Sequence, residues 1–148
     1  MVEDWLKHAS AYPHWAEDTL RFGDSDLIGH INTASYVSYC DTARQIFCYA
    51  CELMKPSDDK VAVVVRTAID LWKELFPPGR IQIGTGVLRL GKTSLTVTQG
   101  LFHENVCVAT AETVLVRFSK TTRQSLGLGP ELISRLQPFM LRKDEPSS

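Results

Sequence analysis

The segment RFGDSDLIGHINTASY, residues 21–36, concentrates side chains that could take part in acyl transfer. Asp26 supplies a carboxylate, which can attack a carbonyl carbon or activate a water molecule to do so. His30, Asn32 and Thr33 follow closely and join Asp26 as candidate catalytic residues. If a helix begins near Asn32, its free backbone N–H groups can stabilise the negative charge that develops on a carbonyl oxygen. The segment thus combines a nucleophile or base with a candidate oxyanion site.

Each of these residues also has a structural interpretation. Aspartate is common in turns and at helix N-caps, so Asp26 could serve there instead. Asn32 could donate its amide to a carbonyl oxygen or cap the helix. His30 could protonate a leaving group, but we expect it to order the loop or line the site. Tyr36 falls on an apolar helical stripe, which is typical of a core position.

The spacing of the segment matches a known pattern, Gly-Asp-x-Asp-x-x-Gly-His-x-Asn-Asn-x-x-Tyr. The matching residues are Gly23, Asp24, Asp26, Gly29, His30, Asn32 and Tyr36. In this pattern the segment resembles the hotdog-fold acyl-CoA thioesterases, in the branch that includes 4-hydroxybenzoyl-CoA thioesterase. Thr33 stands where the pattern has its second asparagine, which could change the corner that binds the carbonyl.

The resemblance implies that Asp26 is the catalytic carboxylate and that a backbone N–H at Thr33 or a neighbour binds the thioester carbonyl. It also implies an acyl-CoA substrate and no cofactor, with Gly29 and Tyr36 beside the substrate. Family members pair their sheets and bind the thioester between protomers, so we expect a homodimer or homotetramer. The long apolar segment 61–72 agrees, because an exposed strand edge invites pairing with another copy.

Coenzyme A carries phosphates, and basic residues near strand ends suit anion binding, although they are often only solvated. The candidates are Arg89, Lys92 and Arg117. Two other functions stay open: a hydratase or dehydratase that pairs His30 with Asp26, and a protein that binds acyl-CoA without turnover. The spacing favours hydrolysis, because those two residues are neighbours on one loop rather than on facing elements.

The elements that position this loop follow from hydrophobic periodicity. Residues 17–22 are predicted to form a first strand. An apolar stripe after Gly29 predicts a long helix that ends at residues 55–57, and apolar residues off the stripe indicate that the helix is mostly enclosed. Four alternating strands at 61–72, 81–90, 94–102 and 106–118, joined by short turns, fit an antiparallel meander, and a short helix follows at 129–136.

This order of elements predicts an α+β hotdog fold, in which a five-stranded antiparallel sheet wraps around one long buried helix. We expect an N-terminal arm at residues 1–16, one domain at 17–141 and a charged tail at 142–148.

Composition excludes several classes of protein. The formal net charge of -1 removes the basic face that nucleic acids require. There is no apolar run long enough to cross a bilayer and no secretory signal. The four cysteines lack the paired spacing of a zinc site and are predicted to be free thiols. We therefore expect a cytoplasmic protein that uses no metal and has neither nucleic-acid nor membrane partners.

Overall fold

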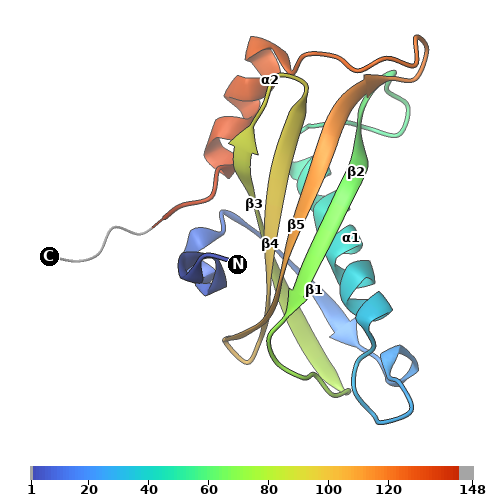
Figure 1. Cartoon of the computed structure of the whole chain (residues 1–148), viewed down its shortest axis with the longest axis vertical. Coiled ribbons are helices and arrows are strands. Elements are labelled where there is room, and N and C mark those ends of the chain that lie inside the picture. The colour runs from blue at the N-terminus through green and yellow to red at the C-terminus, as the bar shows by residue number, and fades with distance from the viewer. Residues whose placement is uncertain (1, 144–148) are drawn as a thin grey trace, which may run out of the picture.

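The computed structural model describes residues 2–143, and its centre is one antiparallel sheet with strand order β1-β3-β4-β5-β2. The strands are β1 (His14–Leu20), β2 (Lys60–Leu71), β3 (Gly79–Leu90), β4 (Ser94–His103) and β5 (Val106–Ser119). The long helix α1 (Thr33–Ala50) lies along one face of the sheet (Figure 1). The short helix α2 (Gly129–Leu136) shares a buried cluster with the C-terminal part of α1. The predicted α+β hotdog arrangement is confirmed.

The first strand lies earlier in the chain than predicted. It pairs with β3 from His14, opposite Thr85, to Leu20, opposite Gly79. Phe22 is not part of the strand but begins the 3-10 turn η3 (Phe22–Asp24). The region predicted as an arm therefore includes the start of β1, because pairing with β3 and not local periodicity sets the strand's limits.

The long helix ends at Ala50 and not at residues 55–57, so the prediction of its C-terminus is wrong. The Leu53 N–H donates to the Cys48 carbonyl at 3.0 Å, which closes the last turn. Glu52 adopts a φ of 54°, a left-handed conformation that is typical of helix ends. The apolar stripe continues to Met54, but a hydrophobic pattern does not reveal where the backbone reverses.

One side of α1 is buried against the sheet, and the other is open. The buried side consists of Tyr36, Tyr39, Cys40, Ala43 and Phe47, each 3% exposed or less. On the open side, Ile46 is 44% and Tyr49 is 58% exposed. The expectation of a helix enclosed on most sides is wrong for a single chain, because one sheet covers only one side of a helix.

The N-terminal residues pack on the sheet face opposite α1 (Figure 1). They form two 3-10 turns, η1 (Asp4–Lys7) and η2 (Ala9–Ala11). Tyr12 lies over Gly84 and Gly100, where an added Cβ would come within 2.6 and 2.7 Å of the tyrosine side chain. Both positions therefore require glycine. No helix within residues 2–143 is long and apolar enough to cross a bilayer.

Candidate active site

The loop between β1 and α1 folds as a small hairpin around Asp26. Ser25 and Ile31 form an isolated antiparallel bridge, and the Asp26 N–H donates to the His30 carbonyl at 2.8 Å. The Gly29 N–H donates to the Asp26 carbonyl at 3.1 Å, and its φ of 85° favours glycine. Gly29, predicted to border the substrate, thus shapes the turn that presents Asp26.

The Asp26 carboxylate is held through one of its two oxygens. Oδ1 accepts hydrogen bonds from the backbone N–H groups of Ile28, at 3.0 Å, and His30, at 3.1 Å. Oδ2 forms no hydrogen bond or ion pair with the part of the chain that the structure describes. Asp26 borders a cavity of about 410 Å³. One oxygen therefore positions the group, and the other is available for chemistry.

Two stretches of the chain border this cavity. The first supplies Asp26, His30, Asn32, Thr33 and Tyr36, so the four predicted catalytic residues and one predicted substrate contact lie together. The second is residues 71–75, at and beyond the end of β2. No spacing in the sequence pointed to this second stretch, because it reaches the loop only through the folded sheet.

The start of α1 offers hydrogen-bond donors beside Asp26. Asn32 caps the helix, because its side-chain oxygen accepts from the Ser35 N–H at 2.8 Å. The Asn32 N–H itself donates to the Asp24 carbonyl at 2.8 Å. The N–H groups of Thr33 and Ala34 then remain without an intrahelical acceptor, as first-turn groups do, at the positive end of the helix dipole. This corner can stabilise an oxyanion.

His30 and Tyr36 are held by contacts with the second stretch and with Phe76, which follows it. His30 Nε2 lies 3.5 Å from a Glu74 carboxylate oxygen, and the ring meets Phe76 edge-on with centroids 4.8 Å apart. The buried Tyr36 hydroxyl donates to the Lys73 carbonyl at 3.3 Å. Burial, and after it the charge of Glu74, raises the pKa of Tyr36, so its phenol stays protonated at neutral pH.

Residues 20–142 match the thioesterase-like superfamily, and this range contains the Asp26 loop, both helices and four complete strands. The chain belongs to the thioesterase-like superfamily. Membership confirms the predicted enzyme class, a thioester hydrolase.

Individual relatives and solved structures are similar to this chain over most of its length. A 1,4-dihydroxy-2-naphthoyl-CoA hydrolase of Synechococcus elongatus is 30% identical over 123 residues, which cover 80% of this chain and 90% of the relative. A crystal structure of a protein from Pseudomonas aeruginosa strain PAO1 has a TM-score of 0.81 at 25% identity, covering 90% and 96% of the two chains. A thioesterase of Thermus thermophilus, solved with coenzyme A and Zn, has a TM-score of 0.74 at 22% identity, covering 87% and 95%.

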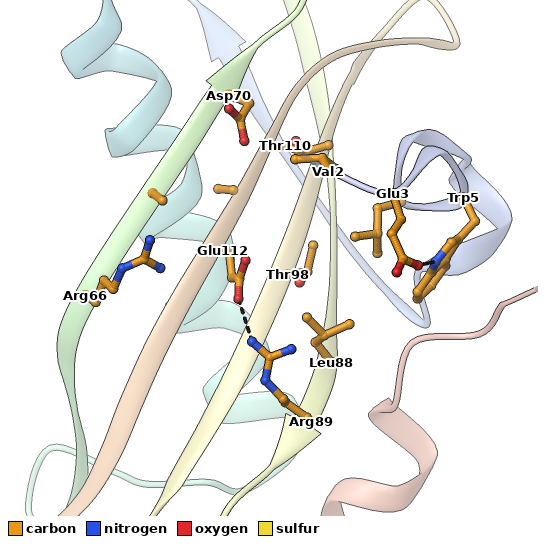
Figure 2. A pocket seen from close by; sticks show the side chains of 13 residues that line it. Val2, Glu3, Trp5, Arg66, Asp70, Leu88, Arg89, Thr98, Thr110 and Glu112 are labelled. Atoms are coloured by element: carbon orange, nitrogen blue, oxygen red, sulfur yellow. Dashed lines mark hydrogen bonds and ion pairs between the residues drawn. The ribbon is translucent and has the colours of Figure 1, made fainter.

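Within one chain, the basic residues predicted to bind coenzyme A lie away from the Asp26 loop. Arg89 pairs with Glu112 at 3.0 Å in a separate cavity of about 470 Å³, on the sheet face that the N-terminal residues partly cover (Figure 2). Arg117 donates to the carbonyls of Gly127 and Leu128, before α2. Lys92 is exposed at the β3–β4 hairpin. The structure does not bring these three cations together with Asp26.

A further cavity of about 280 Å³ lies between α1 and the beginning of β2. Its walls are mainly apolar and include Cys48, Tyr49, Met54, Val61 and Val64. The sequence signal for this groove is the apolar surface that α1 carries off its main stripe, which by itself predicts a helix enclosed by its own sheet.

Three of the four cysteines, Cys40, Cys48 and Cys51, are buried free thiols. Burial raises the pKa of Cys40 and Cys48 to about 12 and that of Cys51 to about 11, so these thiols stay protonated at neutral pH. Across residues 2–143, no group of three or more His, Cys, Asp or Glu side chains is placed to hold a metal ion.

Proposed function

We propose that this chain hydrolyses an acyl-CoA thioester with Asp26 as the catalytic carboxylate and the N–H groups of Thr33 and Ala34 as the oxyanion site. The observation that carries the proposal is the carboxylate itself. Its Oδ1 is fixed by two backbone N–H groups, while the residue borders a cavity at the N-terminus of α1. A positioned carboxylate and preorganised donors are sufficient for an acyl group that is already electrophilic.

Two routes fit this arrangement. In the first, Asp26 attacks the carbonyl carbon, the C–S bond breaks, and coenzyme A leaves as a thiolate; water then hydrolyses the mixed anhydride. In the second, Asp26 removes a proton from a water that attacks the same carbon, and the proton passes to the departing thiolate. Both routes place negative charge on the carbonyl oxygen, where the helix N-terminus stabilises it.

An aromatic acyl group is the first substrate class to test. Curated relatives with 27–30% identity are 1,4-dihydroxy-2-naphthoyl-CoA hydrolases. The cavity beside Asp26 is bordered by Tyr36, whose aromatic ring offers a surface for a flat acyl group.

We further propose that the working unit is a dimer formed through β2. This strand is at the edge of the sheet, and Val63, Val64 and Val65 on it are 38%, 45% and 59% exposed. Antiparallel pairing of two β2 edges would bring the beginning of one strand beside the end of the other. The apolar groove between α1 and β2 lies near the beginning of β2, and so does Arg117. In the dimer, this part of one protomer would approach the Asp26 cavity of its partner.

The test is a hydrolysis screen over aromatic, short, medium and long acyl-CoAs, measured by release of free thiol. We expect turnover of at least one substrate and a loss of about 100-fold or more in Asp26→Ala, in the range observed for positioned acid–base groups. Asp70→Ala is the matched control, because Asp70 is an exposed carboxylate at the end of β2 on the other sheet face. Near wild-type turnover in Asp26→Ala would contradict the assignment.

A further inference from the structure

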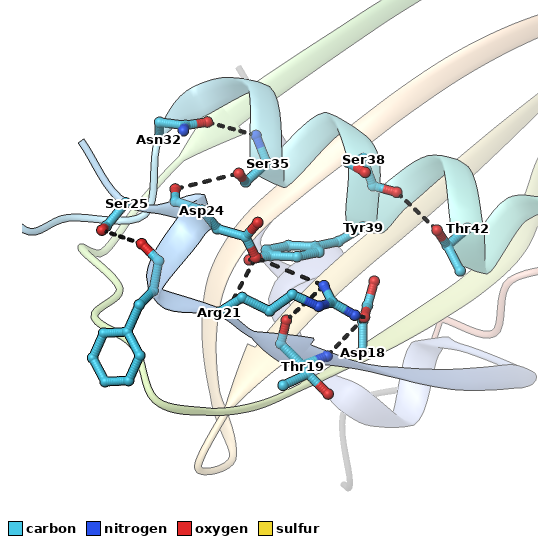
Figure 3. Close-up of polar contacts among 11 residues, drawn as sticks. Asp18, Thr19, Arg21, Asp24, Ser25, Asn32, Ser35, Ser38, Tyr39 and Thr42 are labelled. Atoms are coloured by element: carbon cyan, nitrogen blue, oxygen red, sulfur yellow. Dashed lines mark hydrogen bonds and ion pairs between the residues drawn. The ribbon is translucent and has the colours of Figure 1, made fainter.

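Tyr39 lies in the second turn of α1 and does not border the Asp26 cavity, yet its hydroxyl reaches back to the loop. It donates to Asp24 Oδ2 at 2.6 Å (Figure 3). The tyrosine is 1% exposed and packs in a core cluster with Leu20 and Ile81, which fixes the direction of the hydroxyl. Burial, and after it this hydrogen bond, raises the pKa of Tyr39, so the phenol remains a donor at neutral pH.

Asp24 is tied to its surroundings through both its side chain and its main chain. Oδ2 also accepts from the Arg21 N–H at 3.2 Å, and the Arg21 guanidinium, which is paired with Asp18 at 2.9 Å, lies 3.8 Å away. The Asp24 carbonyl accepts from the Asn32 N–H at 2.8 Å and from the Ser35 hydroxyl at 3.3 Å. Asp24 therefore connects the end of β1, the loop and the first turn of α1 (Figure 3).

These contacts lie next to the two groups that hydrolysis requires, which are the Asp26 carboxylate and the oxyanion donors at the start of α1. Asp26 follows Asp24 by two residues, and Thr33 directly follows Asn32. The hydrogen bond between Asp24 and Asn32 thus spans the separation between the segment that carries the carboxylate and the oxyanion donors. We propose that the Tyr39–Asp24 hydrogen bond is a latch that maintains this separation, so that Tyr39 and Asp24 are positioning residues for thioester hydrolysis. This inference rests on the proposed function of Asp26.

Loss of a positioning residue lowers turnover, whereas loss of an ordinary stabilising residue lowers only the melting temperature. Tyr12 provides the comparison, because it is also a buried tyrosine, and its hydroxyl donates to the Leu6 carbonyl at 2.5 Å on the opposite sheet face. Tyr39→Phe and Tyr12→Phe each remove one buried hydroxyl and leave the ring in place. We expect both variants to lower the melting temperature slightly, but only Tyr39→Phe to affect turnover.

The kinetic test compares these two variants on the best acyl-CoA found in the screen. We expect Tyr39→Phe to lower kcat about 10-fold with KM within about twofold, since small displacements of a catalytic group cost rate more than binding. Tyr12→Phe is expected to keep wild-type kcat. In a double-mutant cycle, Tyr39→Phe should cost little more turnover when Asp24→Ala is already present, because the Tyr39 hydroxyl then has no carboxylate to donate to. Equal kcat in the two tyrosine variants would overturn the latch.

Hydrogen exchange separates this inference from the proposed function. In Tyr39→Phe, amides in the peptide covering residues 24–32 should exchange faster, whereas Tyr12→Phe should leave them unchanged. If the wild-type chain hydrolyses no acyl-CoA, or Asp26→Ala is fully active, the proposed function fails while faster exchange still supports the latch. Unchanged exchange in Tyr39→Phe overturns the latch, whether or not the enzyme is active.

Discussion

The Ile31 N–H donates to the Leu75 carbonyl at 2.8 Å, and this bond joins the Asp26 loop to the stretch that follows β2. Both stretches border the cavity beside Asp26. β2 is an edge strand of the sheet, and it leads directly into the stretch that forms one wall of the candidate active site. This connection links the proposed dimer to the proposed activity.

Association through β2 is expected to weaken in Val65→Lys. Val65 is 59% exposed where the β2–β5 register shifts, and a lysine on an exposed edge opposes strand pairing. Light scattering at micromolar concentration should give about twice the chain mass of 16.6 kDa for the wild type and a lower mass for the variant, with reduced turnover. Val106→Lys, a 45% exposed position at the start of β5, is the control that should remain a dimer. A fully active wild-type monomer would contradict the shared pocket.

Replacing Asn32 should separate its two possible roles. Asn32→Ala removes the side-chain cap on the Ser35 N–H and is expected to lower the free energy of unfolding by about 1 kcal/mol, measured by urea denaturation. Asn32→Ser retains an accepting oxygen without adding a charge beside the oxyanion site and should restore most of that stability. If Asn32→Ser also restores turnover, capping is sufficient; if turnover stays low, the amide itself contacts the thioester.

Asp59 should make stability depend on acid pH. Its carboxylate accepts from the Thr121 hydroxyl at 2.6 Å, the Ser119 hydroxyl at 2.8 Å and the Thr121 N–H at 2.8 Å. These bonds hold the pKa of Asp59 below its usual value, with the Thr121 hydroxyl as the largest cause. A depressed folded-state pKa contributes stability above the unfolded-state pKa, and this contribution is lost as pH falls through the folded-state value.

The corresponding measurement is the melting temperature of Asp59→Asn against pH. We expect the variant to melt below the wild type at neutral pH, and the difference to shrink as the pH falls through the lowered pKa of Asp59, where the folded wild type loses this carboxylate charge. Asp70→Asn serves as the control. A difference that stays constant down to acid pH would show that packing rather than ionisation accounts for it.

Turnover is expected to be independent of metal ions. The chemistry proposed for Asp26 needs only the carboxylate and backbone donors, and Cys40, Cys48 and Cys51 are buried protonated thiols. Exhaustive chelation followed by the thiol-release assay should leave the rate unchanged. Loss of activity that returns on addition of a divalent ion would contradict this expectation.

Local sequence determined the core of the candidate site. Asp26, Gly29, His30 and Asn32 lie within one short loop, so their spacing alone places them together, and hydrogen bonds between near neighbours hold that loop in shape. Periodicity likewise determined the existence of α1 and four of the strands, because one face of each must be apolar to pack.

The tertiary structure determined the features that depend on contacts between separate segments of the chain. The limits of β1 follow from its register with β3, and the second wall of the cavity follows from the bond between Ile31 and Leu75. The same holds for Arg89 and Arg117, whose charge suited phosphate binding, but whose guanidinium groups contact Glu112 and the segment before α2. Ile31 and Leu75, and Arg89 and Glu112, lie far apart in the sequence, so no local pattern encodes these contacts; they form only when the whole chain folds.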